Sequence, residues 1–302
     1  MGTSSMYDGP KRSPLLPPDF NDGDGSQDNP SPDNNPQEKP QEERPGRDAE
    51  PGKNEPSDKP REDNAAQEQS TSSNLQYSSW RAAKTSMSRY VTGNGGPNGK
   101  RNAVTRYIKG HGGSNNAAKT ARAAIMTTIR IGDFFGGVSR NGISQVLKDN
   151  KILTEGRKPK EILSDIVNLL APTPDLNDDS VARKALVITM SIIYERFDDE
   201  SKDISLLDSL EPDVSKMLIT KYFETYIYER LIHDLGSKIE KRAENSEAAA
   251  KIEKELKEYI ETKVSTTLKD KPLSIINSNT DKVEGLVEGL YQQCYKVLED
   301  QL

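Results

Sequence analysis

Cysteine and histidine, which often build catalytic and metal sites, are scarce in this 302-residue sequence. It contains one cysteine, Cys294, and two histidines. One cysteine excludes an internal disulfide framework and is typical of a reducing compartment, so we expect a cytoplasmic protein. The few histidines and the cysteine lie far apart, which argues against a zinc site and leaves little for a Cys-His or Ser-His catalytic set. We therefore expect a protein that is not an enzyme and that needs no metal or cofactor.

Long apolar segments are also absent. Only 32% of the residues are hydrophobic, and no apolar run approaches the length of a membrane span. The sequence does not begin as a signal peptide does, and we expect no membrane association. Few residues that could enter a core precede residue 80, so the core must come from the remainder of the chain. That remainder is long enough for one helical domain.

Residues 21–73 contain no aromatic and no branched aliphatic residue. Such a segment cannot bury enough surface to offset the entropy that is lost when a chain becomes ordered. Residues 8–70 carry 16 acidic and 8 basic residues, a net charge of −8. We predict a disordered, acidic, proline-rich linker over residues 21–74. A second interpretation is that it folds back on basic residues further along the chain, but its evenly mixed charges favour a solvated linker.

Acidic residues are missing from the 64 residues between Gln69 and Gly132, which hold ten Lys or Arg. The rest of the chain has 48 acidic against 32 basic residues. The same window contains an internal repeat, because Ser-Arg-Tyr-Val-Thr-Gly-Asn-Gly-Gly at 88–96 returns as Thr-Arg-Tyr-Ile-Lys-Gly-His-Gly-Gly at 105–113. Each copy is expected to end a helix with Arg-Tyr-aliphatic and then to break it with a glycine turn.

The repeat supports several interpretations, which the sequence leaves open. Basic residues interleaved with aromatic rings suit a nucleic-acid surface, with cations for phosphates and rings such as that of Trp80 for bases. The same residues could meet an acidic protein partner, or form ordinary helix faces in which the two tyrosines pack as equivalent corners. The candidate basic surface comprises Arg89, Tyr90, Arg106, Tyr107 and Lys109.

The start of the chain has two notable features. Gly2 follows Met1, and removal of the methionine would expose the glycine amine, whereas Met6 stands where a myristoylation signal has Ser or Thr. Pro14, Pro17 and Pro18 favour an extended conformation that presents the apolar side chains of Leu15 and Leu16. We interpret residues 1–20 as a docking and conjugation motif.

Three sequence features together resemble the QatB family. They are Met-Gly-Thr-Ser at the start, Gly-Pro-x-x-Ser-Pro-Leu-Leu-Pro-Pro at 9–18, and the Arg-Tyr-Val/Arg-Tyr-Ile glycine repeat. The specific resemblance covers residues 2–20 and 86–137. QatB proteins are one component of the four-protein bacterial Qat anti-phage defence system. Their companions resemble an ATPase, a QueC-like enzyme of deazaguanine chemistry and a TatD-like nuclease.

The resemblance implies a role and a set of partners. The chain would bind the QueC-like enzyme, with the ATPase and TatD-like components as further partners. Resemblance to related QueC-containing defence operons implies that its Gly2 amine would accept a deazaguanine carboxylate that the QueC-like enzyme activates with ATP, so the chain would be a substrate and not a catalyst. The residues implied for partner binding are Thr3, Ser4, Gly9, Pro10, Ser13, Pro14, Leu15, Leu16, Pro17 and Pro18.

Apolar residues in the second half of the chain recur with helical spacing, and no alternating strand pattern persists. We predict an all-α helical bundle preceded by a long disordered N-terminal arm. The basic segment would cover residues 75–137 and the C-terminal helical domain residues 138–302. The predicted helices are 80–91, 100–109, 114–131, 143–148, 159–170, 180–197, 212–235, 237–268 and 280–302.

Two further clusters have simple structural interpretations. An aromatic stripe at helical spacing is expected to pack in the core; it consists of Tyr222, Phe223, Tyr226, Ile227, Tyr228 and Leu231. An acidic cluster is expected to be solvated charge at a helix end and not a set of metal ligands; it consists of Glu195, Asp198, Asp199 and Glu200.

Overall fold

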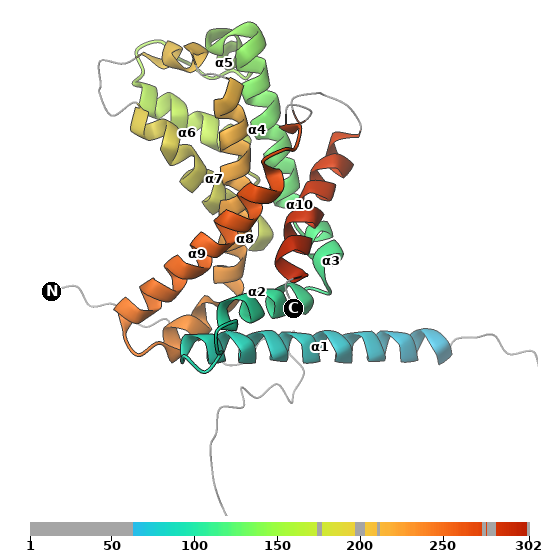
Figure 1. Cartoon of the computed structure of the whole chain (residues 1–302). Helices are drawn as coiled ribbons and strands as arrows, with labels where there is room; N and C mark the ends of the chain where they lie inside the picture. Colours follow the sequence, from blue (N-terminus) through green and yellow to red (C-terminus); the bar gives the residue numbers. More distant parts are fainter. Residues whose placement is uncertain are drawn as a thin grey trace, which may run out of the picture. The chain divides into compact units, whose positions relative to one another are not determined.

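The computed structural model describes residues 63–173, 177–196, 203–209, 212–273, 276 and 282–300 (Figure 1). These residues form helices and no strand, which confirms the predicted all-α fold. In chain order the elements are α1 (Asp63–Val91), α2 (Gly99–Gly110), α3 (Ser114–Lys119), α4 (Arg122–Asn141), α5 (Ile143–Asp149), α6 (Pro159–Leu170), α7 (Asn177–Arg196), the 3-10 helix η1 (Ile204–Ser209), α8 (Pro212–Arg242), α9 (Ser246–Leu268) and α10 (Val283–Glu299).

Helix α8 lies at the centre of the helical body, in contact with α1, α4, α7 and α9. Helix α1 lies along α2 and crosses α8 near the C-terminal end of α8 (Figure 1). Helix α10 packs against α2, α3, α4 and α9. The first helices of the body are therefore joined to its last helix. No helix in the described ranges combines the length and apolar character that a membrane span requires.

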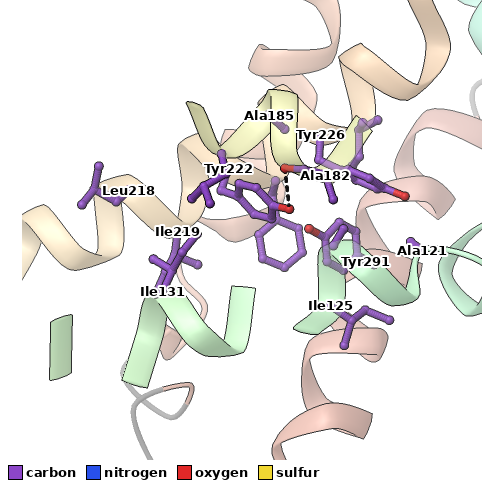
Figure 2. Packing of buried hydrophobic residues seen from close by; sticks show 14 of the residues in the cluster. Ala121, Ile125, Ile131, Ala182, Ala185, Leu218, Ile219, Tyr222, Tyr226 and Tyr291 are labelled. Atoms are coloured by element: carbon purple, nitrogen blue, oxygen red, sulfur yellow. Dashed lines mark hydrogen bonds between the residues drawn. The ribbon is translucent and has the colours of Figure 1, made fainter. Parts of the chain in front are cut away.

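The predicted aromatic stripe is buried in the core except for Tyr228, which is half-buried. Figure 2 shows Tyr222 and Tyr226 among the buried side chains. Phe223 of α8 stacks on Tyr291 of α10 with ring centroids 4.0 Å apart, and Tyr226 meets the same ring edge-on at 5.7 Å. The Tyr222 hydroxyl donates a hydrogen bond of 3.3 Å to the carbonyl of Ala182 in α7. Burying large rings contributes much of a core's stability, and the hydroxyl groups gain partners when they are buried. This packing joins α7, α8 and α10.

The single helix predicted after the second glycine turn is wrong, because the structure divides it into α3 and α4. Two side chains from other helices satisfy the backbone at the break. Arg230 of α8 donates to the Ala117 carbonyl and to the Thr120 hydroxyl, both at 2.8 Å. Asp178 of α7 accepts a hydrogen bond of 2.9 Å from the Ala123 amide in the first turn of α4. These partners replace the helical hydrogen bonds that the break removes.

The predicted helix break at Gly236 is also wrong, because α8 continues through this glycine. Gly236 is buried, and the buried neighbours Leu235 and Ile239 hold the helix against the core. The break comes later, where the Asn245 side chain caps α9 by accepting a hydrogen bond of 2.8 Å from the Ala248 amide. Tertiary burial therefore outweighs the low helix propensity of glycine here.

Helix α1 begins at Asp63, earlier than the predicted helix start at residue 80. The first half of α1 lacks the apolar periodicity that predicts an amphipathic helix. However, no proline or glycine occurs between Pro60 and Gly93 to interrupt one. Residues 1–62, which hold the predicted N-terminal motif and most of the predicted linker, lie outside the described residues.

The predicted boundary after residue 137 falls inside α4, so it does not separate two segments of the fold. Gly132, in the same helix, allows close packing against another segment of the chain. A Cβ added at Gly132 would lie 2.5 Å from Ile276 Cγ2 and 2.9 Å from the Ile276 carbonyl oxygen. Gly132 therefore allows another segment to approach α4 closely and does not end the helix.

Candidate functional site

A groove with a volume of about 570 Å³ lies between α1 and α2, and we call it the α1–α2 groove. Most of the side chains that line it are polar or small, and no acidic residue is among them. The lining comes from α1, from the loop after it and from α2, and consists of Ser78, Arg81, Ala82, Thr85, Ser86, Arg89, Asn94, Gly95, Gly99, Asn102 and Arg106. The groove is therefore a cationic, hydrogen-bonding site.

Helical spacing explains why these residues share the groove. Arg81, Thr85 and Arg89 follow one another at intervals of four residues and therefore lie on one face of α1. Asn102 and Arg106 stand four residues apart on α2, which packs along α1. The two facing stripes enclose the groove.

The internal repeat places its two arginines in the same groove. Arg89 and Arg106 occupy equivalent positions in the two copies, and both side chains are exposed. Among the residues that the structure describes, neither they nor Arg81 form an ion pair with a carboxylate. Two residues of the predicted basic surface thus join Arg81 in the groove, and within the described residues none of the three guanidinium groups has an ion-pair partner.

Glycines let the backbone come close beneath the groove. A Cβ at Gly95 would lie 2.8 Å from the Gly99 Cα and 3.2 Å from the Tyr90 Cα. A Cβ at Gly99 would lie 3.3 Å from the Tyr90 ring. Only glycine allows the loop between α1 and α2 to fold this tightly over Tyr90, and Gly93 and Gly96 in the same loop have φ values of +74° and +66°.

The two tyrosines of the repeat point into the protein, as the packing interpretation predicted. The Tyr90 hydroxyl donates to Glu255 of α9 at 2.7 Å, and the Tyr107 hydroxyl donates to Asp234 of α8 at 3.0 Å. Burial, reinforced by these carboxylates, raises the pKa of both phenols, so they remain donors. Tyr107 is only 1% exposed, and the base-stacking role considered for its ring is therefore wrong.

Trp80, the third ring considered for nucleic acid, also packs against the body. It lies edge-on to Tyr107 and His111, with ring centroids 5.9 and 4.9 Å away. His111 Nε2 lies 3.3 Å from the Asp234 carboxylate, which therefore meets both Tyr107 and His111. Burial lowers the pKa of His111, although its interaction with Asp234 acts in the opposite direction. This cluster joins the second copy of the repeat to α8.

Other basic residues of the acid-free window have different surroundings. Lys109 is half-buried and does not line the α1–α2 groove. Arg122 lies 3.7 Å from Glu284 of α10. Arg130 donates to the Ala171 carbonyl at 3.0 Å. The basic residues of the window therefore differ in their surroundings. Of its arginines that form no ion pair within the described residues, Arg81, Arg89 and Arg106 line the groove and Arg101 does not.

In the described part of the chain the one thiol is buried. Cys294 is 1% exposed, and burial raises the pKa of its thiol well above the usual range, which keeps it from acting as a nucleophile. In the same ranges no group of three or more His, Cys, Asp or Glu residues is arranged to hold a metal ion. Of the acidic cluster at the end of α7, only Glu195 lies within the described residues, and it is exposed.

The predicted conjugation site Gly2 and the predicted docking residues lie outside the described residues. The docking set comprises Thr3, Ser4, Gly9, Pro10, Ser13, Pro14, Leu15, Leu16, Pro17 and Pro18. The interpretation of residues 1–20 as a docking and conjugation motif therefore stays a prediction.

Sequence reasoning missed the part of the site that α1 contributes. Arg81, Thr85 and Ser86 line the groove, but the repeat does not include them. Tyr77 also lies on α1 and is 66% exposed, whereas the rings of Trp80, Tyr90 and Tyr107 pack against the body. The signal that could have found these residues is the four-residue spacing of Tyr77, Arg81, Thr85 and Arg89, which predicts one helix face.

Comparisons with known proteins agree with the resemblance in the sequence. A family model described as the Qat anti-phage system associated protein QatB matches residues 112–298, more than half of the chain. The match covers α3 to α9 and most of α10, whereas the specific resemblance of the sequence motifs ended at residue 137. No curated protein and no solved structure matches the chain. The chain therefore belongs to the QatB family and is a component of the Qat anti-phage system.

Proposed function

We propose that this chain binds a QueC-like enzyme of the same system and presents the amine of Gly2 for conjugation to a deazaguanine carboxylate. The observation that carries the proposal is a QatB-family body in a chain whose Gly2 follows Met1. The chain would act as the substrate of its partner and not as an enzyme. The buried, protonated Cys294 is consistent with that role.

The chemistry of an α-amine suits this step. An α-amine has a pKa of about 7.7–8.0, against about 10.4 for a lysine side chain, so far more of it is the neutral nucleophile near pH 7. ATP would convert the carboxylate into an acyl adenylate and release pyrophosphate. The Gly2 nitrogen would then attack the carbonyl carbon, form an amide bond, expel AMP and lose a proton to solvent. Glycine has no side chain to obstruct entry into an active site.

The prolines and leucines of the arm would hold it on the partner. Proline favours an extended backbone, so Pro14, Pro17 and Pro18 would lower the entropy that binding must remove. Leu15 and Leu16 would fill apolar pockets of the QueC-like enzyme. The segment between them and Gly2 would then fix how far the amine reaches.

Modification of purified chain by the QueC-like enzyme, ATP and the carboxylate tests this proposal. Mass spectrometry of the N-terminal peptide should show the conjugate on Gly2 of the wild-type chain. Gly2→Pro should abolish it, because the amine becomes secondary and hindered, and added residues before Gly2 should abolish it by moving the terminus. Leu15→Asp with Leu16→Asp should weaken binding at least about tenfold, because charge would be buried in apolar pockets.

Lys11→Arg is the matched control and should be modified as the wild type is, because lysines stay protonated near neutral pH. Conjugation at Lys11, or equal conjugation of Gly2→Pro and wild type, would contradict the proposal. If the variant with Leu15→Asp and Leu16→Asp loses modification but binds the partner as the wild type does, the docking role of the leucines is refuted and the conjugation of Gly2 is not.

A further inference from the structure

We propose that the α1–α2 groove binds the phosphate backbone of a single-stranded nucleic acid, and that Tyr77 stacks on a base at the end of the groove. This site is separate from Gly2, and the inference does not depend on conjugation. Helices α1 and α2 lie side by side in Figure 1, and the groove is the space between their facing side chains.

Charge is the first reason for this assignment. Three arginines from two helices line a groove that contains no carboxylate, and within the described residues none of them has an ion-pair partner. Like charges that share a groove repel each other, and a bound anion relieves that repulsion. Arginine also suits phosphate, since its planar guanidinium can donate two parallel hydrogen bonds.

The spacing of the arginines favours a chain of phosphates over one small anion. Arg81 and Arg89 are eight residues apart on α1, which corresponds to about 12 Å along the helix axis. At that spacing the two arginines can each meet a different phosphate of one strand, because a nucleic-acid strand carries a phosphate about every 3.4 Å of duplex axis. Arg106 approaches from α2, so a strand in the groove would meet cations from both walls.

The size of the groove favours one strand over two. A volume of about 570 Å³ is within the range of sites that take small ligands, about 300–1,000 Å³. A segment of a single backbone fits such a space, but a duplex would have to stay outside and touch only the rim.

The remaining lining suits a backbone better than a peptide. Thr85, Ser86 and Asn102 offer hydroxyl and amide groups to phosphate and sugar oxygens. Protein partners are usually held by large apolar or aromatic anchors, and none lines this groove. Backbone contacts carry no sequence information, so binding should be largely independent of sequence.

Tyr77 supplies the ring that the groove itself lacks. It lies four residues before Arg81, so the two share a face of α1, and its side chain is 66% exposed. An exposed ring next to a cationic groove is the arrangement with which sequence-tolerant single-strand binders stack bases.

Fluorescence anisotropy of the full chain with a labelled oligothymidylate of about 16 nucleotides tests the inference. Affinity should fall steeply with salt, with a slope near 0.7 for each phosphate that is neutralised. Arg81→Ala, Arg89→Ala and Arg106→Ala should each weaken binding about three- to tenfold and lower the slope by about 0.7. Tyr77→Ala should weaken binding at least about fivefold without changing the slope, and Tyr77→Phe should restore it.

Lys119→Ala is the matched control, because it removes one exposed positive charge of the acid-free window outside the groove. It should change the affinity less than twofold. Circular dichroism of each variant should show unchanged melting, since the substituted arginines are exposed. Equal losses for Lys119→Ala and the arginine variants would overturn the inference, as would the absence of binding at low salt. Tighter binding to polyglutamate or to duplex DNA than to the oligothymidylate would overturn it as well.

Discussion

At the scale of single residues, the arginine and the tyrosine that follow each other in each copy of the repeat face different sides of their helix. Arg89 and Arg106 face the groove, while Tyr90 and Tyr107 donate to carboxylates of α8 and α9. Successive residues on a helix are about 100° apart, so an arginine and the next tyrosine cannot share a face. The sequence predicts that the copies are equivalent. It cannot predict which residue faces outward, because that depends on α8 and α9 lying on the tyrosine side.

Asp234 illustrates a residue whose surroundings the sequence does not reveal. It meets Tyr107, His111 and His233, which come from α2, the turn after it and α8. Burial acts to raise the pKa of Asp234, but interactions with His111, His233 and Tyr107 together lower it. Tyr107 and His111 lie more than a hundred residues from Asp234 in the sequence, so local patterns cannot indicate the cluster.

The low pKa of His111 predicts a loss of stability on mild acidification. The free imidazole has a pKa of about 6.5, and burial lowers that of His111 in the folded protein. Between the two values the unfolded chain binds more protons, so stability rises with pH and falls as pH drops below about 6.5. Each unit of difference in pKa corresponds to about 1.4 kcal/mol. Urea unfolding between pH 7.5 and 5.5 should show this fall.

His111→Gln should reduce this pH dependence while leaving a donor near Asp234. His233→Gln is the control, because that side chain is 45% exposed and loses less solvent on folding. A pH dependence that persists unchanged in His111→Gln and disappears in His233→Gln would contradict the assignment to the buried imidazole.

At the scale of helices, the sequence predicts the interiors better than the ends. Helix α6 matches the predicted 159–170 because Pro159 starts it and its apolar face is regular. Elsewhere the ends depend on distant residues: Arg230 and Asp178 stabilise the break between α3 and α4, and Glu299 accepts a hydrogen bond of 2.9 Å from the Ser114 amide at the start of α3. Such partners appear only after folding.

Two helical glycines should respond in opposite ways to substitution by alanine. Gly132→Ala should destabilise the protein by about 1–3 kcal/mol, because its Cβ would collide with Ile276. Gly285→Ala in α10 should stabilise it by about 0.5–1 kcal/mol, because nothing lies within 4 Å of the added Cβ and alanine favours the helix. Urea unfolding of both variants checks this. A stabilising Gly132→Ala would refute the close packing of α4 on Ile276.

At the scale of the whole molecule, composition and helical periodicity were enough to predict an all-α body with its aromatic stripe in the core. They placed its start too late, since the first half of α1 is polar and carries no periodic signal. The sequence also indicated that basic residues are concentrated in the acid-free window. It did not indicate that α1 and α2 enclose a groove lined by three of these arginines. Pairing of two helices through a glycine loop requires three-dimensional contacts that no local pattern encodes.

The measurement that bears most directly on the proposed function is the intact mass of this chain, purified from cells that carry the complete, active Qat system. We predict that it exceeds the mass of the methionine-free chain by one deazaguanine acyl group, located on Gly2 by fragmentation. The same chain from cells that lack the QueC-like enzyme should have no added mass. An unmodified Gly2 in cells with the complete active system would contradict the proposal that this amine is conjugated.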